Sequence, residues 1–249
     1  MKVLNNVKLA ILIPTTSFKQ DNWQSIYDTF LFKNTLNTFN ITFSKKFPVK
    51  FFIGYDKNDR IWDNQYNQNL IKSLFNFPIE FYLLNANKGH LTKMWNQLFL
   101  QAINENFNYF YQCGDDINFY TKNWDYDSIL ILKKNNNIGI SGPKNNHPTI
   151  LTQAMFSIKH FQIFGYLFNE EIINWCCDDW YNLLYQKHRF ILKKHYCSND
   201  GGKAIEPRYI INNDNNFNLH DKFSLLKKNI KNIVNQDINI LNKYLINYN

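Results

Sequence analysis

Two adjacent carboxylates follow directly on a strand-like run near the middle of the chain. Residues 109–112, Tyr-Phe-Tyr-Gln, are typical of a buried strand, and Cys113 and Gly114 lead from it to Asp115 and Asp116. Carboxylates avoid burial unless their charge is compensated. Mg²⁺ and Mn²⁺ prefer oxygen ligands, and Mg²⁺ is typically held by one or two carboxylates and by phosphate oxygens of a substrate. The pair therefore predicts a metal site and a phosphate-bearing substrate, with an ordinary Asp-Asp turn as the alternative.

A second acidic pair, Asp178 and Asp179, lies between cysteines and tryptophans in the stretch Trp-Cys-Cys-Asp-Asp-Trp at 175–180. These neighbours indicate that the carboxylates enter a partly buried site. Burial raises the pKa of a carboxyl group, and a raised pKa suits a general base that works near neutral pH. The alternative is that one aspartate caps the helix expected to follow Trp180, because aspartate caps helix N-termini well. At least one of the two is predicted to be catalytic.

Two basic side chains are further candidates for the same site. His195 lies at the end of an expected strand, where a neutral imidazole would complete a metal site begun by carboxylates. The alternative for a lone histidine is a structural role. Lys93 lies one helical turn after Gly89 and would meet a phosphate near that helix start, or else it is an ordinary solvated lysine.

Strand and helix patterns alternate over about the first 120 residues, which predicts an α/β fold with a mostly parallel central sheet flanked by helices. The expected strands are 9–13, 49–54, 79–84 and 109–112, and the expected helices are 23–37, 64–75 and 89–104. Ligands bind beyond the carboxyl ends of the strands in such sheets. Three of these ends are polar here, at 15–17, 56–59 and 115–116. Their convergence favours a binding site over a chance turn.

The second half of the chain is less regular and would build the other wall of a cleft. Its expected helices are 124–133, 160–167 and 170–185, and its expected strands are 138–142, 151–157 and 190–196. No linker rich in proline, glycine or serine divides the chain, so one domain at 1–221 is predicted. Residues 222–249 form a predicted helical tail, because apolar residues fall near one helical face. This helix packs on its own domain or, alternatively, joins two copies in a homo-oligomer.

Composition and charge argue against several classes of protein. The net charge is +8, but the basic residues are scattered and only three are arginines, which argues against nucleic-acid binding. The four cysteines form no CxxC pair, so neither a structural zinc site nor a secreted disulfide framework is expected. No apolar segment has the length of a membrane span. A soluble cytoplasmic protein is therefore expected. The motifs GxxxxGK[ST] and GxGxxG are missing, which argues against a P-loop or dinucleotide-binding protein.

The order of these features resembles that of GT-A-fold glycosyltransferases of family 2, which use nucleotide-sugar donors. A first strand runs into Pro-Thr-Thr at 14–16, a second strand ends at Asp56, and the helix from residue 89 precedes the acidic strand. Gly-Asp-Asp at 114–116 resembles the metal-binding DxD motif, and the pair at 178–179 resembles the acidic motif of the catalytic base. The resemblance covers roughly residues 9–195, and the tail lies outside it.

The resemblance implies how the donor would be held. Thr15, Thr16 and Asp56 would bind the nucleobase and ribose of a UDP-type or GDP-type nucleotide sugar, with the UDP type favoured. Lys93 would approach the diphosphate. Asp115 would contact the ribose or the metal.

The resemblance also implies a mechanism. Asp116, with Asp115, would place Mn²⁺ or Mg²⁺ on the diphosphate, and the metal would neutralise charge on the leaving nucleoside diphosphate. Asp179, or Asp178, would take the proton from an acceptor hydroxyl, which predicts inversion at the anomeric carbon. The expected enzyme is of the hexosyltransferase type, and its acceptor is a glycan or a protein.

The chain departs from the family pattern at Gly114, where a DxD motif has its first aspartate, and this leaves strict metal dependence open. One alternative is a nucleotidyltransferase that makes a nucleotide sugar, although the segment 14–18 lacks the glycine-rich basic loop of that class. The other is a non-catalytic glycan-binding or scaffold module of the same fold. The composition also resembles that of giant DNA virus proteins, in which case the cytoplasm would be that of a host cell.

Overall fold

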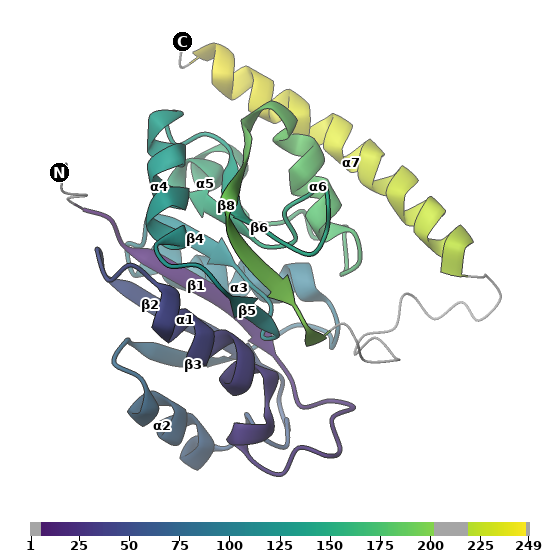
Figure 1. Cartoon of the computed structure of the whole chain (residues 1–249). Coiled ribbons are helices and arrows are strands. Elements are labelled where there is room, and N and C mark those ends of the chain that lie inside the picture. The colour runs from purple at the N-terminus through teal and green to yellow at the C-terminus, as the bar shows by residue number, and fades with distance from the viewer. Residues whose placement is uncertain (1–5, 202–218, 248–249) are drawn as a thin grey trace.

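A mixed eight-stranded sheet forms the centre of the computed structural model, which describes residues 6–201 and 219–247 (Figure 1). Its strands are β1 (Leu9–Thr15), β2 (Val49–Tyr55), β3 (Ile79–Leu83), β4 (Tyr109–Gln112), β5 (Ile117–Phe119), β6 (Ile140–Lys144), β7 (Ala154–Ser157) and β8 (Arg189–Asn199). Their order across the sheet is β3-β2-β1-β4-β7-β6-β8-β5. Strands β1 to β4 run parallel, as the alternating pattern of the first half predicted. Strand β7 runs antiparallel to β4 and β6, and β5 runs antiparallel to β8.

The central strand β1 shows why the sheet is covered on both faces. Leu9, Ile11 and Ile13 point into one apolar core, and Ala10 and Leu12 point into the other. All five side chains are fully buried. A central strand of a parallel sheet is buried on both faces and is therefore apolar at every position. The continuous apolar run in the sequence is the consequence.

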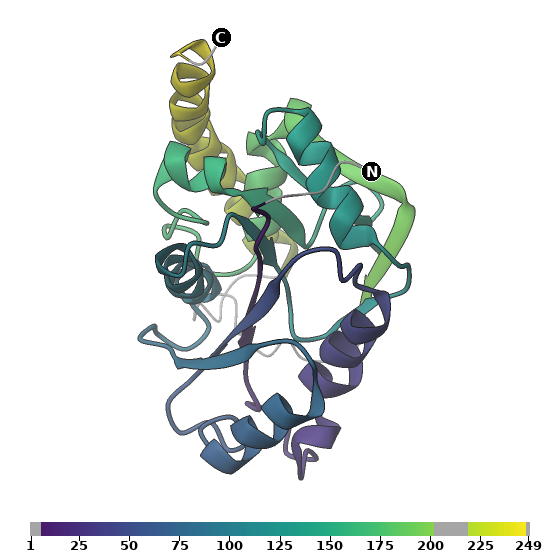
Figure 2. The same cartoon turned by 90° about the vertical axis from the view of Figure 1, so that its left-hand side faces the viewer.

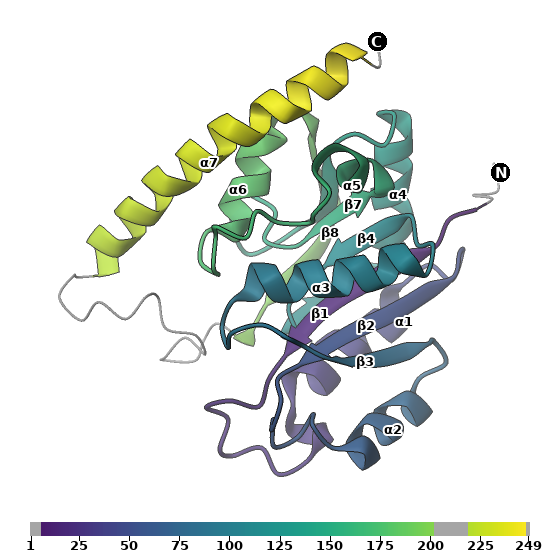
Figure 3. The same ribbon diagram turned by 180° about the vertical axis from the view of Figure 1, so that it is seen from behind.

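Helices cover each face of the sheet, as the side view in Figure 2 shows. The short helices η1 (Ile26–Asp28) and η2 (Leu31–Leu36) lie on one face together with α1 (Asn37–Thr42), α2 (Gln65–Leu74) and α4 (Trp124–Lys134). The other face, seen from behind in Figure 3, carries α3 (Leu91–Asn104), α5 (Ile158–Phe164), α6 (Cys177–Leu184) and α7 (Leu219–Asn247). A single turn, η3 (Gln186–His188), precedes β8. Within the described residues, no helix combines the length and apolar character needed to cross a membrane.

The C-terminal helix α7 packs across α5 and α6 (Figure 3). Its inner face buries Ile230, Ile233 and Leu241 in the same core as α3. Asp237, also buried, accepts hydrogen bonds from Trp180 Nε1 at 2.8 Å, Tyr166 Oη at 2.9 Å and Asn169 Nδ2 at 3.3 Å. The helix therefore packs on its own domain, which was the first of the two predicted alternatives. The domain boundary at 221 and a homo-oligomer through α7 stay predictions.

Three elements differ most from the predictions. The helix expected over 23–37 is divided into η1, η2 and α1, and α1 continues to Thr42. The helix expected over 170–185 begins only at Cys177, because Cys176 adopts a left-handed conformation with φ of 64° that a continuous α-helix does not contain. Strand β5 was not predicted, since three residues carry too short a pattern to recognise.

Candidate active site

The carboxyl ends of β1 and β4 are joined through two of the predicted residues. Thr15 Oγ1 donates a hydrogen bond to Asp115 Oδ2 at 2.7 Å, and both side chains are almost fully buried. The two strands are parallel neighbours, so their ends lie at the same edge of the sheet. A buried carboxylate needs such a donor because leaving it without one is costly. The convergence expected from the strand ends is therefore confirmed for Thr15 and Asp115.

Asp116 is enclosed by two glycines and the end of β8. Its backbone carbonyl accepts a hydrogen bond from the Asp200 N–H at 3.1 Å. A Cβ atom on Gly114 would lie 2.6 Å from Asp116 Oδ1, and a Cβ atom on Gly201 would overlap Asp116 Oδ2. The Asp116 carboxylate thus occupies space that side chains at both positions would need. Glycine at 114 therefore leaves room for the Asp116 carboxylate in the position that it occupies.

Completing the DxD pattern with Gly114→Asp is expected to damage the protein. The new side chain would displace the Asp116 carboxylate and add a third negative charge beside Asp115. Overpacking of this kind typically costs about 1–3 kcal/mol of unfolding free energy, and urea unfolding at pH 7 measures it. Gly114→Ala carries the same steric cost without the charge and separates the two causes. Unchanged stability together with tighter metal-dependent binding of UDP in Gly114→Asp would contradict this explanation.

Asp59 holds the loop after β1 against the loop after β2. Its carboxylate accepts hydrogen bonds from Thr16 Oγ1 at 3.0 Å, Ser17 N at 2.6 Å and Ser17 Oγ at 2.8 Å. It also accepts from the backbone N–H groups of Ile61 and Trp62. The hydroxyl of Thr16, expected to contact a nucleobase or ribose, is therefore engaged in holding this loop. Sequence analysis placed Asp59 only within a polar strand end, since nothing in the local sequence shows its partner 42 residues away.

Asp56, directly after β2, has an oxygen atom without a partner. Asp56 Oδ2 is buried and has no hydrogen-bond partner among the described residues. Burial raises the pKa of this carboxyl group; the nearby Lys88 opposes the rise and Asp59 adds to it. The ammonium group of Lys88 lies 3.7 Å from the centre of the Phe18 ring, so the loops after β1 and β3 meet beside Asp56. A buried, unpaired acceptor at a sheet edge fits an N–H donor on a ligand.

The second acidic pair lies in the first turn of α6, on partly buried positions. Asp178 Oδ1 accepts a hydrogen bond from the Asp179 N–H at 3.0 Å. Burial and the neighbouring charge of Asp179 raise the pKa of Asp178 to about 6, although Lys227 of α7 acts in the opposite direction. The N-cap of α6 is Cys176 and not an aspartate, so the capping alternative is wrong for both residues. The raised pKa of Asp178 suits a general base, and that role stays a prediction.

Tyr181 connects the start of α6 to the end of β4. Its hydroxyl lies 3.3 Å from Gln112 Oε1 and 3.0 Å from the carbonyl oxygen of Leu151. Tyr181 is three residues after Asp178, so the two lie on the same side of α6 one turn apart. Gln112 is the last residue of β4 and is followed by the stretch that ends in Asp115 and Asp116. The second acidic pair is therefore anchored to the strand that carries the first.

The start of α3 is occupied by a segment from the second half of the chain. The N–H of Thr92 donates to the carbonyl oxygen of Ile173 at 3.3 Å, and Thr92 Oγ1 donates to that of Ile172. Asn174 Nδ2 donates to the carbonyl oxygen of Gly89 at 3.2 Å. Lys93 lies half-buried in this first turn. Its approach to a diphosphate stays a prediction.

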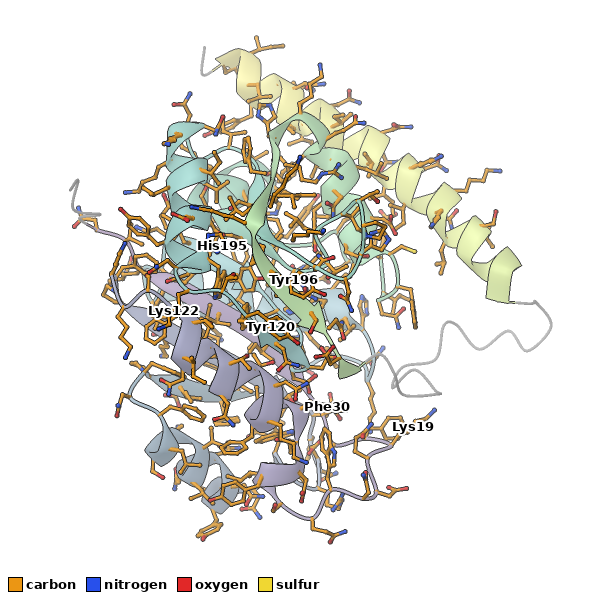
Figure 4. The ribbon with its side chains drawn as sticks, in the orientation of Figure 1. Lys19, Phe30, Tyr120, Lys122, His195 and Tyr196 are labelled. Atoms are coloured by element: carbon orange, nitrogen blue, oxygen red, sulfur yellow. The ribbon has the colours of Figure 1, made fainter. Side chains whose placement is uncertain are left out.

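His195 is engaged away from the paired aspartates, between β8 and α4 (Figure 4). Its Nε2 lies 2.9 Å from Asp127 Oδ2 on α4, and its Nδ1 lies 3.1 Å from Thr121 Oγ1. Lys194 Nζ lies 2.7 Å from the same Asp127 oxygen. Across residues 6–201 and 219–247, no three His, Cys, Asp or Glu side chains are grouped as a metal site. These contacts hold His195 between β8 and α4, as its structural alternative expected, and its role as a metal ligand stays a prediction.

A metal at Asp116 would need ligands from a substrate. Asp115 and Asp116 offer only oxygen donors, which fits Mg²⁺ or Mn²⁺. Asp115 accepts the Thr15 hydroxyl, which holds one of its oxygens at this edge of the sheet. Mg²⁺ sites commonly contain one or two carboxylates and phosphate oxygens, which matches this sparse set. The residues therefore fit a metal that binds together with a diphosphate.

Comparison with known proteins identifies the fold and nothing finer. By sequence, the chain matches no family model and no curated protein. By structure, it is similar to S. aureus TarS, with a TM-score of 0.54 and 13% identity over 76% of this chain and 36% of that one. TarS 1-349 in complex with UDP gives a TM-score of 0.51 and 16% identity over 77% of this chain and 60% of that chain. TarS 1-349 in complex with UDP-GlcNAc gives a TM-score of 0.52 and 15% identity over 77% of this chain and 58% of that chain.

These matches bear on the predicted fold class. The chain spans between 36% and 60% of the length of the TarS chains it matches. TarS has a GT-A-like fold, and likeness at such low identity shows the fold alone. The predicted fold class is confirmed: the chain has a GT-A-like α/β fold with a central sheet flanked by helices and a C-terminal helix.

Proposed function

We propose that this chain is a glycosyltransferase that moves a hexose from a UDP-sugar to a hydroxyl group of a glycan or protein acceptor. The observation that carries the proposal is the buried Asp56 Oδ2, which has no hydrogen-bond partner among the described residues and lies at the sheet edge shared with Asp115 and Asp116. A nucleotide sugar requires a hydrogen-bond acceptor for its nucleobase. It also requires carboxylates that hold a metal on its diphosphate. The UDP and UDP-GlcNAc complexes of TarS, which shares the fold, support this class of donor.

Asp56 would accept a hydrogen bond from the nucleobase. Uracil and guanine each carry a ring N–H flanked by a carbonyl group, and this N–H can donate to a carboxylate oxygen. Neutral adenine and cytosine have no such ring N–H on their pairing edge. Their amino groups can also donate to a carboxylate, so the preference for a UDP-type donor rests on the UDP and UDP-GlcNAc complexes of TarS. Thr15 and Thr16 would act mainly by fixing the loop and the Asp115 carboxylate that surround the donor.

The diphosphate would lie against Asp116, with Lys93 at the start of α3 as a further cation. Asp116, supported by Asp115, would hold Mg²⁺ or Mn²⁺. Such a metal supplies neutralisation of the charge that develops on the leaving nucleoside diphosphate. Asp115 keeps its own orientation through Thr15, which limits the reorganisation needed when the donor binds.

The pair at the start of α6 would deprotonate the acceptor. Asp178, or its neighbour Asp179, takes the proton from the acceptor hydroxyl as its oxygen bonds to the anomeric carbon. The bond from that carbon to the diphosphate oxygen breaks, and the electron pair leaves with the diphosphate. Attack opposite the leaving group inverts the anomeric configuration. A pKa of about 6 keeps Asp178 largely ionised at neutral pH and still basic enough to accept a proton.

Titration calorimetry with free nucleotides tests the donor site. The parent protein is expected to bind UDP or GDP in the presence of Mn²⁺ and to bind ADP and CDP at least tenfold more weakly. Asp56→Ala is expected to lose about 1–3 kcal/mol of binding free energy for UDP, since the base N–H loses its acceptor. Asp21→Ala, which removes an exposed aspartate of the loop after β1, is the matched control. Equal affinity of parent and Asp56→Ala would contradict the assignment.

A further inference from the structure

Two exposed tyrosines lie side by side on the edge of the sheet beyond Asp116 (Figure 4). Tyr120 follows β5, the edge strand, and Tyr196 belongs to its neighbour β8. Tyr120 is 56% exposed and Tyr196 is 38% exposed. Inward-facing Phe119 and Cys197, their neighbours in sequence, are buried. The alternation of a β-strand therefore places both tyrosine rings on the outer face of this two-stranded ribbon.

The two rings are held in a fixed arrangement. Their centres are 5.4 Å apart, and their planes meet at 31°. The Tyr120 N–H donates to the carbonyl oxygen of Tyr196 at 3.1 Å, which continues the ladder between the strands. The Tyr120 hydroxyl lies 3.0 Å from Ser198 Oγ and 3.4 Å from Asp200 Oδ2. A ligand that stacks on these rings would meet a surface that is already ordered.

Polar groups beside the rings connect this surface to the candidate active site. Asp200 Oδ2 accepts hydrogen bonds from Ser198 Oγ at 2.8 Å and from Asn118 Nδ2. The N–H of the same Asp200 donates to the carbonyl oxygen of Asp116. Tyr120 is four residues after Asp116, which is about 13 Å of extended chain. A chain of two or three sugar units spans that distance.

We propose that the tyrosine platform, defined as Tyr120 and Tyr196 with Asn118 and Asp200, binds a pyranose ring of the acceptor glycan. This rests on the proposed function, since the acceptor is the second substrate of that reaction. The C–H face of a pyranose is apolar and packs on an aromatic ring, and its hydroxyls need carboxylate, amide and hydroxyl partners. Tyrosine supplies rigid contact area at low entropic cost. The platform therefore selects acceptors long enough to reach it.

A glycan array probed with fluorescently labelled protein tests the platform. The parent is expected to bind a set of oligosaccharides, and the best of them is then titrated by calorimetry beside its monosaccharide. The double variant Tyr120→Ala/Tyr196→Ala is expected to bind that oligosaccharide at least about tenfold more weakly, because two stacking surfaces are lost. Tyr66→Ala, which removes a 74% exposed tyrosine on α2, is the matched control and is expected to bind like the parent. Tyr120→Phe keeps the ring and is expected to keep most of the affinity.

Two results would overturn the platform. One is a parent protein that binds no glycan on the array, and the other is a double variant that binds like the parent. If the double variant is unstable, the single variant Tyr196→Ala carries the same expectation of weaker binding. Binding of UDP, measured separately, is expected to be equal in the parent and every platform variant. Absence of UDP binding in the parent would instead refute the proposed function, so the two failures are distinguishable.

Discussion

Asp178→Asn is expected to lower sugar transfer by about 10²–10⁴-fold and, at the same time, to stabilise the folded protein above pH 6. The loss of activity follows from removal of a general base. The gain in stability follows from the pKa of about 6 that burial and Asp179 give to Asp178 in the folded state. An unfolded aspartate has a pKa of about 3.9, so folding opposes ionisation of this carboxyl group.

The direction of the Asp178 pKa shift determines the pH range over which the stability of the protein changes. A folded pKa above the unfolded one means that the contribution of Asp178 to stability is fully present below about pH 4 and is lost as the pH rises through 6. A neutral asparagine avoids that loss, so the gain in unfolding free energy at pH 8 is on the order of 2 kcal/mol. Urea unfolding of parent and variant at pH 4 and pH 8 measures it.

Asp179→Asn is the matched variant for this experiment. If Asp178 is the base, Asp179→Asn keeps more activity than Asp178→Asn. Loss of activity in Asp179→Asn alone would assign the base to Asp179 instead. Equal stability of the parent and Asp178→Asn at pH 8 would contradict a raised pKa for the partly buried Asp178 carboxyl group.

Asp237→Ala is expected to destabilise the protein by about 2–4 kcal/mol, because one buried and two half-buried donors lose a shared charged acceptor. These donors are Trp180 of α6 and Tyr166 and Asn169 of the preceding segment. Asp237 thereby joins α7 to the helix that carries the proposed base. Residues beyond those that resemble the glycosyltransferase family are thus expected to be needed for a stable active site.

Gln236→Ala on the exposed side of the same helix is the control and is expected to change the unfolding free energy by less than about 0.5 kcal/mol. Urea unfolding at pH 7 compares the three proteins. A loss below 1 kcal/mol in Asp237→Ala would show that α7 contributes little to the stability of the domain.

The sequence predicted those helices and strands that are determined by the pattern of their own residues. Strand β4 has the bounds expected, and α3 begins two residues later than the predicted start at Gly89. Continuous apolar runs and a strong helical period decide such elements without help from distant residues. The same reasoning placed Thr15 and Asp115 at one sheet edge, where their hydrogen bond confirms the convergence.

Long-range contacts account for what the sequence did not reveal. The segment before α6 is not helical, because Ile172, Ile173 and Asn174 bond to the start of α3, more than 75 residues earlier in the chain. His195 was predicted as a metal ligand from its strand end, but its partner Asp127 lies on another element. A residue type near a motif therefore predicts a role only when its neighbours in space are also known.

The role of glycine at the acidic motif could not be read from spacing either. Gly114 interrupts the DxD pattern, and from the sequence alone this left strict metal dependence open. In the structure, the carboxylate of Asp116 fills the space beside both Gly114 and Gly201. Gly201 is 85 residues further along the chain, so only the fold brings the three together. The departure from the pattern reflects packing around a retained aspartate.

Thermal unfolding of the parent with UDP and Mn²⁺ tests the central claim most directly. At about a hundred times its dissociation constant, a ligand adds roughly 2.7 kcal/mol to the free energy of unfolding. We predict that UDP with Mn²⁺ raises the unfolding temperature, that EDTA reduces this rise, and that Asp116→Asn loses the part that depends on Mn²⁺. An unfolding temperature that neither UDP nor GDP changes, with or without Mn²⁺, would contradict a nucleotide-sugar site at this edge of the sheet.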